Sequence, residues 1–335
     1  MKHSNISIFV PHIGCPHRCS FCDQNTISGA QHAPTADEVR ATCTRALAQI
    51  RSPQNTEIAF FGGSFTAIPR PYMEELLGAA SEFVGEGKFR GIRISTRPDC
   101  IDPEILFILR SYGVTAIELG AQSMSDSVLE ANERGHTAQD VENACELIKS
   151  FGNDGFELGL QMMIGLYKST PGDEWETIRR ITELSPATVR IYPVVVLKGT
   201  RLAQLLESGG YTPFEFEKAV EIASSAMIMF EGSGIRVIKC GLHASEFVER
   251  DMIGGFYHPA FRELCEGMVY RHNMEFELDE CTSPADRATF AVSPSCISKA
   301  LGHKKSNYEY FLKKGTEIKI IGDDNIPKYK CELRR

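Results

Sequence analysis

Residues 14–22 read GCPHRCSFC and place Cys15, Cys19 and Cys22 in a C-x3-C-x2-C spacing. Three thiolates this close together can bind three irons of one cubane cluster. A fourth cysteine at a matching distance is missing, so one iron would stay open to a ligand from outside the protein. Clusters that transfer electrons are held by four cysteines, whereas an open iron suits catalysis. The spacing therefore predicts a catalytic iron-sulfur cluster.

Two other interpretations of these cysteines stay open. A structural zinc ion prefers four protein ligands and could recruit His12 or His17. The thiols could also be unligated core residues. Eight further cysteines show no such spacing, and we expect them mainly in the core. They are Cys43, Cys100, Cys145, Cys331 and a group that could converge on a second metal, Cys240, Cys265, Cys281 and Cys296.

The composition favours a large α/β protein of a reducing compartment. A chain of 335 residues fits a barrel of roughly 200 to 250 residues with an appendage. Eleven cysteines without a signal peptide, and an N-terminal stretch too short and polar to span a bilayer, predict a soluble cytoplasmic protein without a membrane partner. The net charge of -8 argues against a generally basic nucleic-acid binder, yet residues 299–335 carry a local excess of five positive charges.

Strands and helices alternate along the first part of the chain. Residues 6–10 form a short apolar run, so the cysteines would follow the first strand, where (β/α) barrels carry out their chemistry. Thr35 and Glu38 make a capping box that opens a helix to about residue 50. We expect a partial (β/α)6 barrel with further strands at 57–61, 91–95, 114–123, 155–165, 188–196 and 236–240 and further helices at 103–112, 173–184, 201–208 and 214–233.

Residues that contact a ligand are expected at the strand ends. Gly62 and Gly63 end the second strand and let the backbone approach a ligand that a Cβ would push away, although such a pair can be only a tight turn. Polar residues end the next two strands and are candidates for contacts with a ribose or a substrate, unless they cap the following helices. They are Ser95, Thr96, Glu118 and Gln122.

Several segments together resemble the radical SAM superfamily and, within it, the radical SAM domain of the Elongator catalytic subunit family. A more distant similarity is to oxygen-independent coproporphyrinogen oxidases. The segments are GCPHRCSFC with Phe21 before its last cysteine, STRPD (95–99), IELGAQS (117–123), NERGHT (132–137) and VRIYPVVVLKGT (189–200). The resemblance covers about residues 5–262, including GLH (241–243) and GGFYHPAF (254–261).

This resemblance implies a [4Fe-4S] cluster on the three cysteines and S-adenosylmethionine (SAM) bound to the open iron through its amino and carboxylate groups. Gln122 and Arg134, twelve residues apart, would hold the ribose and the carboxylate of SAM, and the planar fork of arginine suits a carboxylate. Ser64 and Ser95 stand where relatives often have acidic residues. The implied cofactor contacts are Phe21, Gly62, Gly63, Ser64, Ser95, Thr96, Gln122, Arg134 and Val195, and the substrate candidates are Glu118, His243, Tyr257 and His258 unless the histidines are structural.

The implied reaction is the reductive cleavage of SAM to a 5′-deoxyadenosyl radical, which needs an external one-electron reductant and takes a hydrogen atom from the substrate. The Elongator resemblance implies an enzyme that modifies RNA, with tRNA as the expected substrate. The chain ends about where the acetyltransferase domain of those proteins would begin, so we expect no acetyl-CoA chemistry. Two alternatives stay open: a radical SAM enzyme that acts on a small molecule, and a non-catalytic, metal-bearing RNA-binding protein.

The end of the chain is expected to form a small α+β domain, residues 259–335, after a barrel with its extension at residues 1–258. Its expected elements are helix 260–271, strands 273–279 and 288–292, helices 294–301 and 306–314, and strand 317–321. The order resembles a KH domain, in which a Gly-x-x-Gly loop clamps an RNA backbone, with Lys305 in place of the second glycine. The implied RNA contacts are Gly302, His303, Lys304, Lys305, Lys313 and Lys314, unless the domain serves only for packing.

Overall fold

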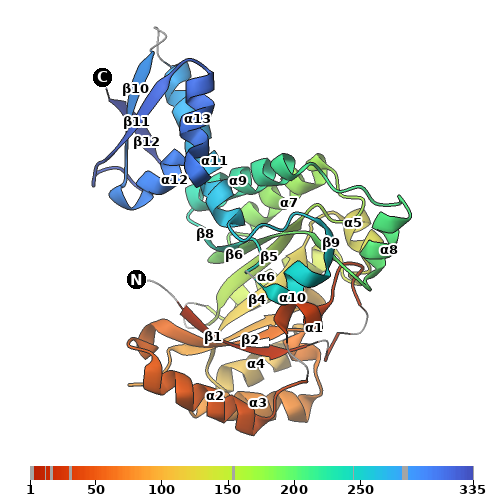
Figure 1. The fold of residues 1–335 in the computed structure, drawn as a ribbon. Helices are drawn as coiled ribbons and strands as arrows, with labels where there is room; N and C mark the ends of the chain where they lie inside the picture. Colours follow the sequence, from red (N-terminus) through yellow and green to blue (C-terminus); the bar gives the residue numbers. More distant parts are fainter. Residues whose placement is uncertain are drawn as a thin grey trace.

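Seven parallel strands form the central sheet in the order β1-β2-β3-β4-β5-β6-β8 (Figure 1). The computed structural model describes residues 4–11, 13–15, 18–29, 32–152, 155–243, 245–280 and 286–334. The strands are Ser4–Val10 (β1), Thr56–Gly62 (β2), Gly91–Thr96 (β3), Val114–Gln122 (β4), Glu157–Ile164 (β5), Thr188–Pro193 (β6) and Arg236–Cys240 (β8). Because they all run the same way, their carboxyl ends meet at one edge of the sheet, where the cysteine loop begins.

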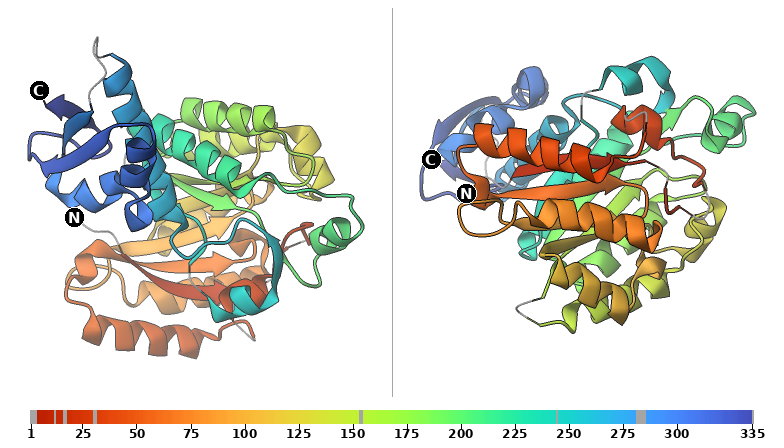
Figure 2. Two further views of the ribbon diagram at one scale, coloured as in Figure 1. Left: turned by 45° about the horizontal axis from the view of Figure 1, so that its top comes forward. Right: turned by 90° about the horizontal axis from the view of Figure 1, so that it is seen from below.

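Helices cover the outside of this curled sheet, as the two views in Figure 2 show. Thr35 and Glu38 form the predicted capping box, because each side chain bonds to the other residue's backbone N–H. The partial α/β barrel predicted from the sequence is confirmed, with seven parallel strands in its sheet. Its helices are Gln24–Ser28 (α1), Ala36–Gln49 (α2), Arg70–Ser81 (α3), Pro103–Ser111 (α4), Asp126–Ala131 (α5), Ala138–Lys149 (α6), Pro171–Glu183 (α7), Arg201–Glu207 (α8), Phe216–Gly232 (α9) and Glu246–Asp251 (α10).

The strand expected at 188–196 is broken into two. β6 ends at Pro193, whose nitrogen has no hydrogen to donate to a neighbouring strand. The chain then continues as Val195–Leu197 (β7), which pairs antiparallel with Met252–Gly255 (β9) in a separate two-stranded sheet. The sequence patterns do not predict β9 or α10.

The tail begins with one long helix, Phe261–Asp279 (α11), so the strand predicted at 273–279 is wrong. The side chains that this helix buries recur about every four residues, at 261, 265, 269–270 and 274, as one face of a helix requires. Phe276 is 65% exposed, so the alternation in NMEFELD does not mark a half-buried strand. The buried side chains include Phe261, Cys265, Val269, Tyr270 and Met274.

A three-stranded sheet completes the tail. Its strand β10 pairs in parallel with β11 and antiparallel with β12. The order from α11 onward is α-β-α-α-β-β, which differs from the expected α-β-β-α-α-β order, although the β-α-α-β centre is as predicted. Within the described ranges, no helix is both long and apolar enough to cross a bilayer. The elements after α11 are Arg287–Val292 (β10), Ile297–Leu301 (α12), Ser306–Lys313 (α13), Glu317–Gly322 (β11) and Cys331–Arg334 (β12).

Candidate active site at the carboxyl edge of the sheet

The cysteine loop lies between β1 and α1 and is fixed to two distant segments of the chain. Ser20 donates its hydroxyl to Asn132 Oδ1 at 2.7 Å, and its backbone N–H donates to the Asn132 carbonyl at 3.1 Å. The N–H of Leu202, in the first turn of α8, donates to the Ser20 carbonyl at 2.8 Å. Asn132 is fully buried. These contacts hold the middle of the cysteine loop in one place.

The two glycines after β2 allow the cysteine loop to pack directly on the end of that strand. Gly62 has φ of 122°, and a Cβ there would lie 2.6 Å from the Val10 carbonyl oxygen. A Cβ on Gly63 would lie 2.6 Å from the Ile13 carbonyl oxygen and 3.4 Å from Cys15 Sγ. Both positions therefore require glycine, because a Cβ would collide with the backbone of β1 or of the segment that leads into the cysteines.

Arg134 and Gln122 lie next to each other beside the cysteine loop. A Cβ on Gly120 would lie 2.9 Å from Gln122 Nε2 and 3.3 Å from Arg134 Nη2, which places both side chains at the same point of β4. Arg134 donates from Nη1 to Cys19 Sγ at 3.0 Å and from Nη2 to the Gly120 carbonyl at 2.7 Å. Arg134 Nε and Gln122 Oε1 are buried and have no hydrogen-bond partner within the described structure.

A cavity of about 550 Å³ opens at this edge of the sheet. Its volume lies in the range of small-molecule sites. Its walls come from both ends of the strand order, with Cys22 on the cysteine loop and Lys239 on β8. Of the predicted site residues, those that line it are Phe21, Cys22, Gly62, Ser95, Gln122, Val195 and His243.

Ser64 and Thr96 point into the protein and do not belong to the residues lining this cavity. Their hydroxyl oxygens are 2.8 Å apart, and Thr66 Oγ1 lies 2.6 Å from Thr96 Oγ1. The backbone N–H of Arg97 also donates to Ser64 Oγ at 3.2 Å. These hydroxyls satisfy one another and tie the ends of β2 and β3 together, so their position supports a structural role.

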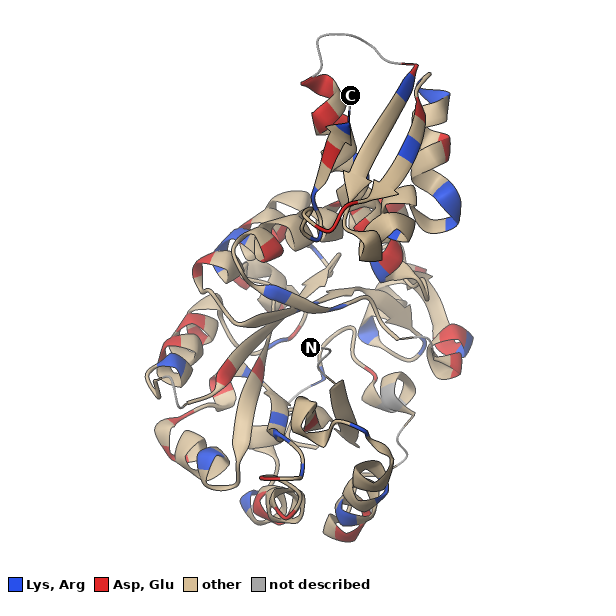
Figure 3. Cartoon of the chain, turned by 90° about the vertical axis from the view of Figure 1, so that its left-hand side faces the viewer, with Lys and Arg blue, Asp and Glu red and all other residues tan. Residues whose placement is uncertain are grey.

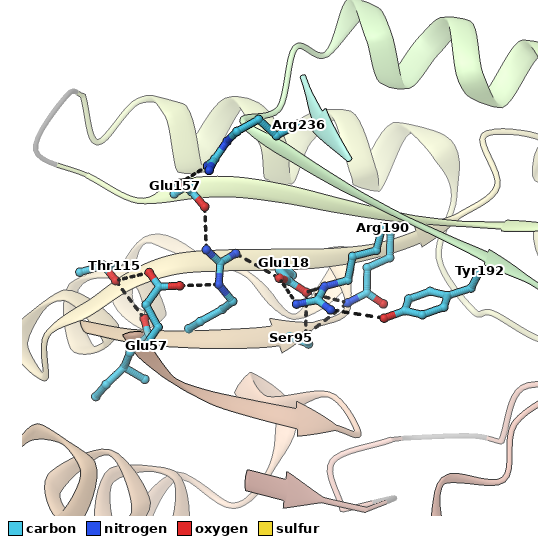
Figure 4. A network of polar contacts seen from close by, with 11 residues as sticks. Glu57, Ser95, Thr115, Glu118, Glu157, Arg190, Tyr192 and Arg236 are labelled. Carbon is cyan, nitrogen blue, oxygen red and sulfur yellow. Dashed lines mark hydrogen bonds and ion pairs between the residues drawn. The ribbon is translucent and has the colours of Figure 1, made fainter. Parts of the chain in front are cut away.

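Glu118 lies in a buried network of charges on the inner face of the sheet (Figure 4). Arg93, which is 1% exposed, contacts Glu57 at 2.7 Å, Glu118 at 3.0 Å and Glu157 at 2.6 Å. Arg190 donates from Nη2 to Glu118 Oε1 at 2.9 Å. Two arginines already bind its carboxylate, and Ser95, Gln161 and Arg190, which contact Glu118, line the cavity in its place.

Tyr257 and His258 make contacts outside the cavity. The Tyr257 hydroxyl donates to Glu249 at 2.9 Å. His258 Nδ1 accepts a hydrogen bond from the N–H of Ala260 at 3.0 Å, and its ring packs against His303 of the tail with centroids 5.6 Å apart. Of the substrate candidates named from the sequence, only His243 lines the cavity.

The proposed RNA loop of the tail has an unusual backbone. Gly302, Lys304 and Lys305 have φ of 80°, 51° and 64°, so two lysines adopt the left-handed conformation that glycine adopts more easily. Both lysines are exposed. Lys314, by contrast, is paired with Glu275 at 2.7 Å, and Lys313 is exposed on α13.

Burial changes the acidity of two groups near the cysteine loop. It raises the pKa of Cys22 to about 12, with a further rise from the neighbouring thiolates, so binding of a metal must displace a proton from this thiol. Burial also lowers the pKa of His136 to about 4, aided by the charge of Arg134. The sequence patterns single out neither His136 nor Asn132, although both lie in NERGHT.

The zinc and second-metal hypotheses both require side chains that converge on one ion. Within the described ranges, no three His, Cys, Asp or Glu side chains converge on a point where one ion could bind. A cubane cluster does not need that convergence, because each cysteine binds a different iron. His12, His17 and Cys281, which the zinc and second-metal hypotheses invoke, lie outside the described residues.

Comparison with protein families identifies the fold and its chemistry. A model of the radical SAM superfamily matches residues 9–181, slightly more than half of the chain, and a model of the radical SAM C-terminal domain matches residues 186–271. The chain belongs to the radical SAM superfamily. Enzymes of this superfamily use a [4Fe-4S] cluster and SAM, and the thiolates, the unpartnered atoms of Gln122 and Arg134 and the adjoining cavity fit that pair.

Several curated proteins are similar to part of this chain. The tRNA uridine(34) acetyltransferase of Methanocaldococcus jannaschii is 35% identical over 141 residues, which are 40% of this chain and 25% of that protein. Elongator complex protein 3 of Mus musculus is 28% identical over 200 residues, which are 53% of this chain and 36% of that protein. The matches with such curated relatives cover from 25% to 67% of the relatives' own lengths.

A solved structure shares the fold. The Elp3 protein of Methanocaldococcus infernus, with an N-terminal deletion, superposes with a TM-score of 0.55 at 20% sequence identity. The superposition covers 75% of this chain and 62% of that one. At this level of identity the likeness shows a common fold.

Proposed function

We propose that this radical SAM enzyme modifies RNA, with tRNA as the substrate. The observation that carries the catalytic part is that Arg134 and Gln122 lie beside the cysteine loop, at the edge of a cavity that Gln122 and Cys22 line. The RNA part is supported by the relatives named tRNA uridine(34) acetyltransferase and Elongator complex protein 3.

In this proposal Cys15, Cys19 and Cys22 hold a [4Fe-4S] cluster, and SAM binds its open iron. When bound, this pair supplies the reactivity that removes a hydrogen atom from the substrate, and an external one-electron reductant is needed. Arg134 donates to Cys19 Sγ, which stabilises the thiolate, while its Nε and Gln122 Oε1 are available to SAM. Phe21 and Val195 give the cavity apolar walls that keep water from the reacting atoms.

The tail is proposed to hold the RNA. Lys304 and Lys305 expose two ammonium groups on a turn, and phosphates bind such groups. Figure 3 shows acidic and basic residues interspersed over the tail, so a local contact at this loop fits better than a continuous basic face. The proposed division of the chain is a barrel with its extension at residues 1–258 and an RNA-binding domain at residues 259–335.

The test is anaerobic turnover. The protein is reconstituted with iron and sulfide, reduced and given SAM, and 5′-deoxyadenosine is quantified with and without bulk tRNA. The proposal predicts 5′-deoxyadenosine from the wild-type protein, none from Cys19→Ala, and a higher rate with tRNA. The double variant Lys304→Glu, Lys305→Glu should lose the tRNA stimulation and keep the basal rate. Turnover that ignores tRNA would contradict the RNA part alone.

A further inference from the structure

The cavity walls carry positive charge without a matching carboxylate. Two of the described lining residues are cationic, Arg190 and Lys239, and none of them is Asp or Glu. Lys239 lies on β8 and the cysteine loop follows β1, at the opposite ends of the strand order. A molecule in the cavity therefore has the cluster site on one side and a cationic surface on the other.

The charge of Arg190 is already balanced by the buried network. The ion pairs of this network (Figure 4) join three glutamates to three arginines, so its charges cancel. Arg190 is bound to Glu118 at 2.9 Å. The members of the network are Glu57, Glu118, Glu157, Arg93, Arg190 and Arg236. The network therefore leaves no negative charge over for a further cation.

Lys239 is the cation that this network does not neutralise. Its side chain is half-buried, and it has no hydrogen bond or ion pair with any described residue. Arg190 and Lys239 are register partners on β6 and β8, so two positive charges lie side by side on the cavity wall. Like charges on neighbouring strands repel each other, and burial away from water strengthens the repulsion.

The surroundings of Lys239 respond to that charge. Burial lowers the pKa of Lys239, and the charges of Arg190 and Arg262 lower it further. Burial and then the charge of Lys239 lower the pKa of His243, which lines the same part of the cavity. An anion bound between Lys239 and Arg190 would remove the repulsion and give the ammonium group its missing partner.

We propose that Lys239, beside Arg190, binds an anionic oxygen group of the substrate, a phosphate or a carboxylate. This inference rests on the proposed function for the identity of the second molecule in the cavity. The carboxylate of SAM is expected at the cysteine loop, near Arg134, whereas Lys239 lies on β8. Lys239 would thus fix which part of the substrate faces the cluster, and it is a specificity-determining residue.

The test measures binding rather than turnover. Calorimetry of the reconstituted enzyme with SAM present would compare uridine 5′-monophosphate, uridine and acetate as ligands. A phosphate site binds the monophosphate and rejects uridine, whereas a carboxylate site binds acetate. Lys239→Gln should lower the affinity for the anion by about 10- to 100-fold, since hydrogen bonds between charged groups contribute that much to binding. Lys239→Arg should restore most of the affinity.

A matched control is Lys88→Gln, which removes the same charge from an exposed lysine in the turn before β3. Its anion affinity should equal that of the wild type, and SAM affinity should be unchanged in every variant. The proposal is overturned if neither anion binds the wild type better than uridine, or if Lys239→Gln binds the anion as the wild type does. A loss of SAM affinity in Lys239→Gln would equally contradict it.

The two proposals fail in different ways. If the wild-type protein makes no 5′-deoxyadenosine, the proposed function fails, while the binding experiment still decides whether Lys239 holds an anion. If 5′-deoxyadenosine forms but Lys239→Gln leaves anion affinity intact, the proposed function stands and the anion site is rejected.

Discussion

Arg134 joins the cysteine loop to β4 through hydrogen bonds with Cys19 Sγ and the Gly120 carbonyl. A lysine could replace one of these contacts but has no planar fork and no second nitrogen in a fixed position. Arg134→Lys should therefore weaken SAM binding by about tenfold or more. Equilibrium binding of SAM to the reconstituted protein measures this. The control is Arg110→Lys on the exposed face of α4, which should bind SAM as the wild type does.

Glu174 is a buried carboxyl group that makes the stability of the protein depend on pH. It accepts hydrogen bonds from Gly165 N–H at 2.7 Å and from the Ser169 hydroxyl at 2.8 Å, yet burial raises its pKa to about 7. The folded state therefore holds a proton that the unfolded chain releases near pH 4.5. The stability from this proton is present below that pH and is lost as the pH rises to about 7.

We predict that Glu174→Gln removes this loss, which is on the order of 3 kcal/mol. Urea unfolding of the wild type and of Glu174→Gln between pH 4.5 and 8 measures it as the difference between the two curves. The comparison with the variant is needed because His136, with a pKa lowered to about 4, makes stability rise with pH over nearly the same pH range in which Glu174 makes it fall. Parallel curves for the two proteins would contradict the prediction.

At the residue scale, the sequence predicts chemistry better than it predicts contacts. The resemblance assigns Gln122 and Arg134 to SAM, and the structure places their side chains next to each other. The hydroxyls of Ser64 and Thr96 satisfy each other instead of facing the cavity, because their partners come from distant strands. Asn132 gives no signal in the sequence, since its role depends on Ser20, far away in the chain.

At the scale of elements, the sheet depends on charges buried in its inner face. Glu118 is 1% exposed and forms ion pairs with both Arg93 and Arg190. Glu118→Ala leaves both arginines without this partner and should lower the free energy of unfolding by about 3–5 kcal/mol. Urea denaturation measures it.

The control for this prediction is Arg179→Ala on the exposed face of α7, which breaks surface ion pairs with Glu176 and Glu183. It should cost less than about 1 kcal/mol. Equal losses in the two variants would contradict the view that burial gives the inner network its importance.

The elements of the barrel are predictable because their apolar runs are long and separated by caps, such as Thr35 with Glu38. The tail is harder to predict. NMEFELD alternates as a strand would, but it continues the helix of α11, where Met274 packs inward and Phe276 is exposed. The break at Pro193 and the pairing of β7 with β9 depend on a partner sixty residues away.

At the scale of the whole molecule, barrel and tail share one hydrophobic core through α11. Arg262 near its start donates to the Val237 carbonyl on β8, and Asn273 near its end donates to the Tyr329 carbonyl of the tail. The loop with Lys304 reaches the barrel through the contact of His303 with His258. The tail is thus held at the β8 side of the sheet, where Lys239 also lies.

In the proposed function, Cys15, Cys19 and Cys22 hold a cluster whose open iron binds SAM. Electron paramagnetic resonance of the reduced, reconstituted protein, recorded before and after addition of SAM, tests it most directly. We predict a cluster signal that changes on addition of SAM, and a Cys19→Ala protein without that response. A colourless wild-type protein that holds stoichiometric zinc, or a cluster signal that SAM leaves unchanged, would contradict the account.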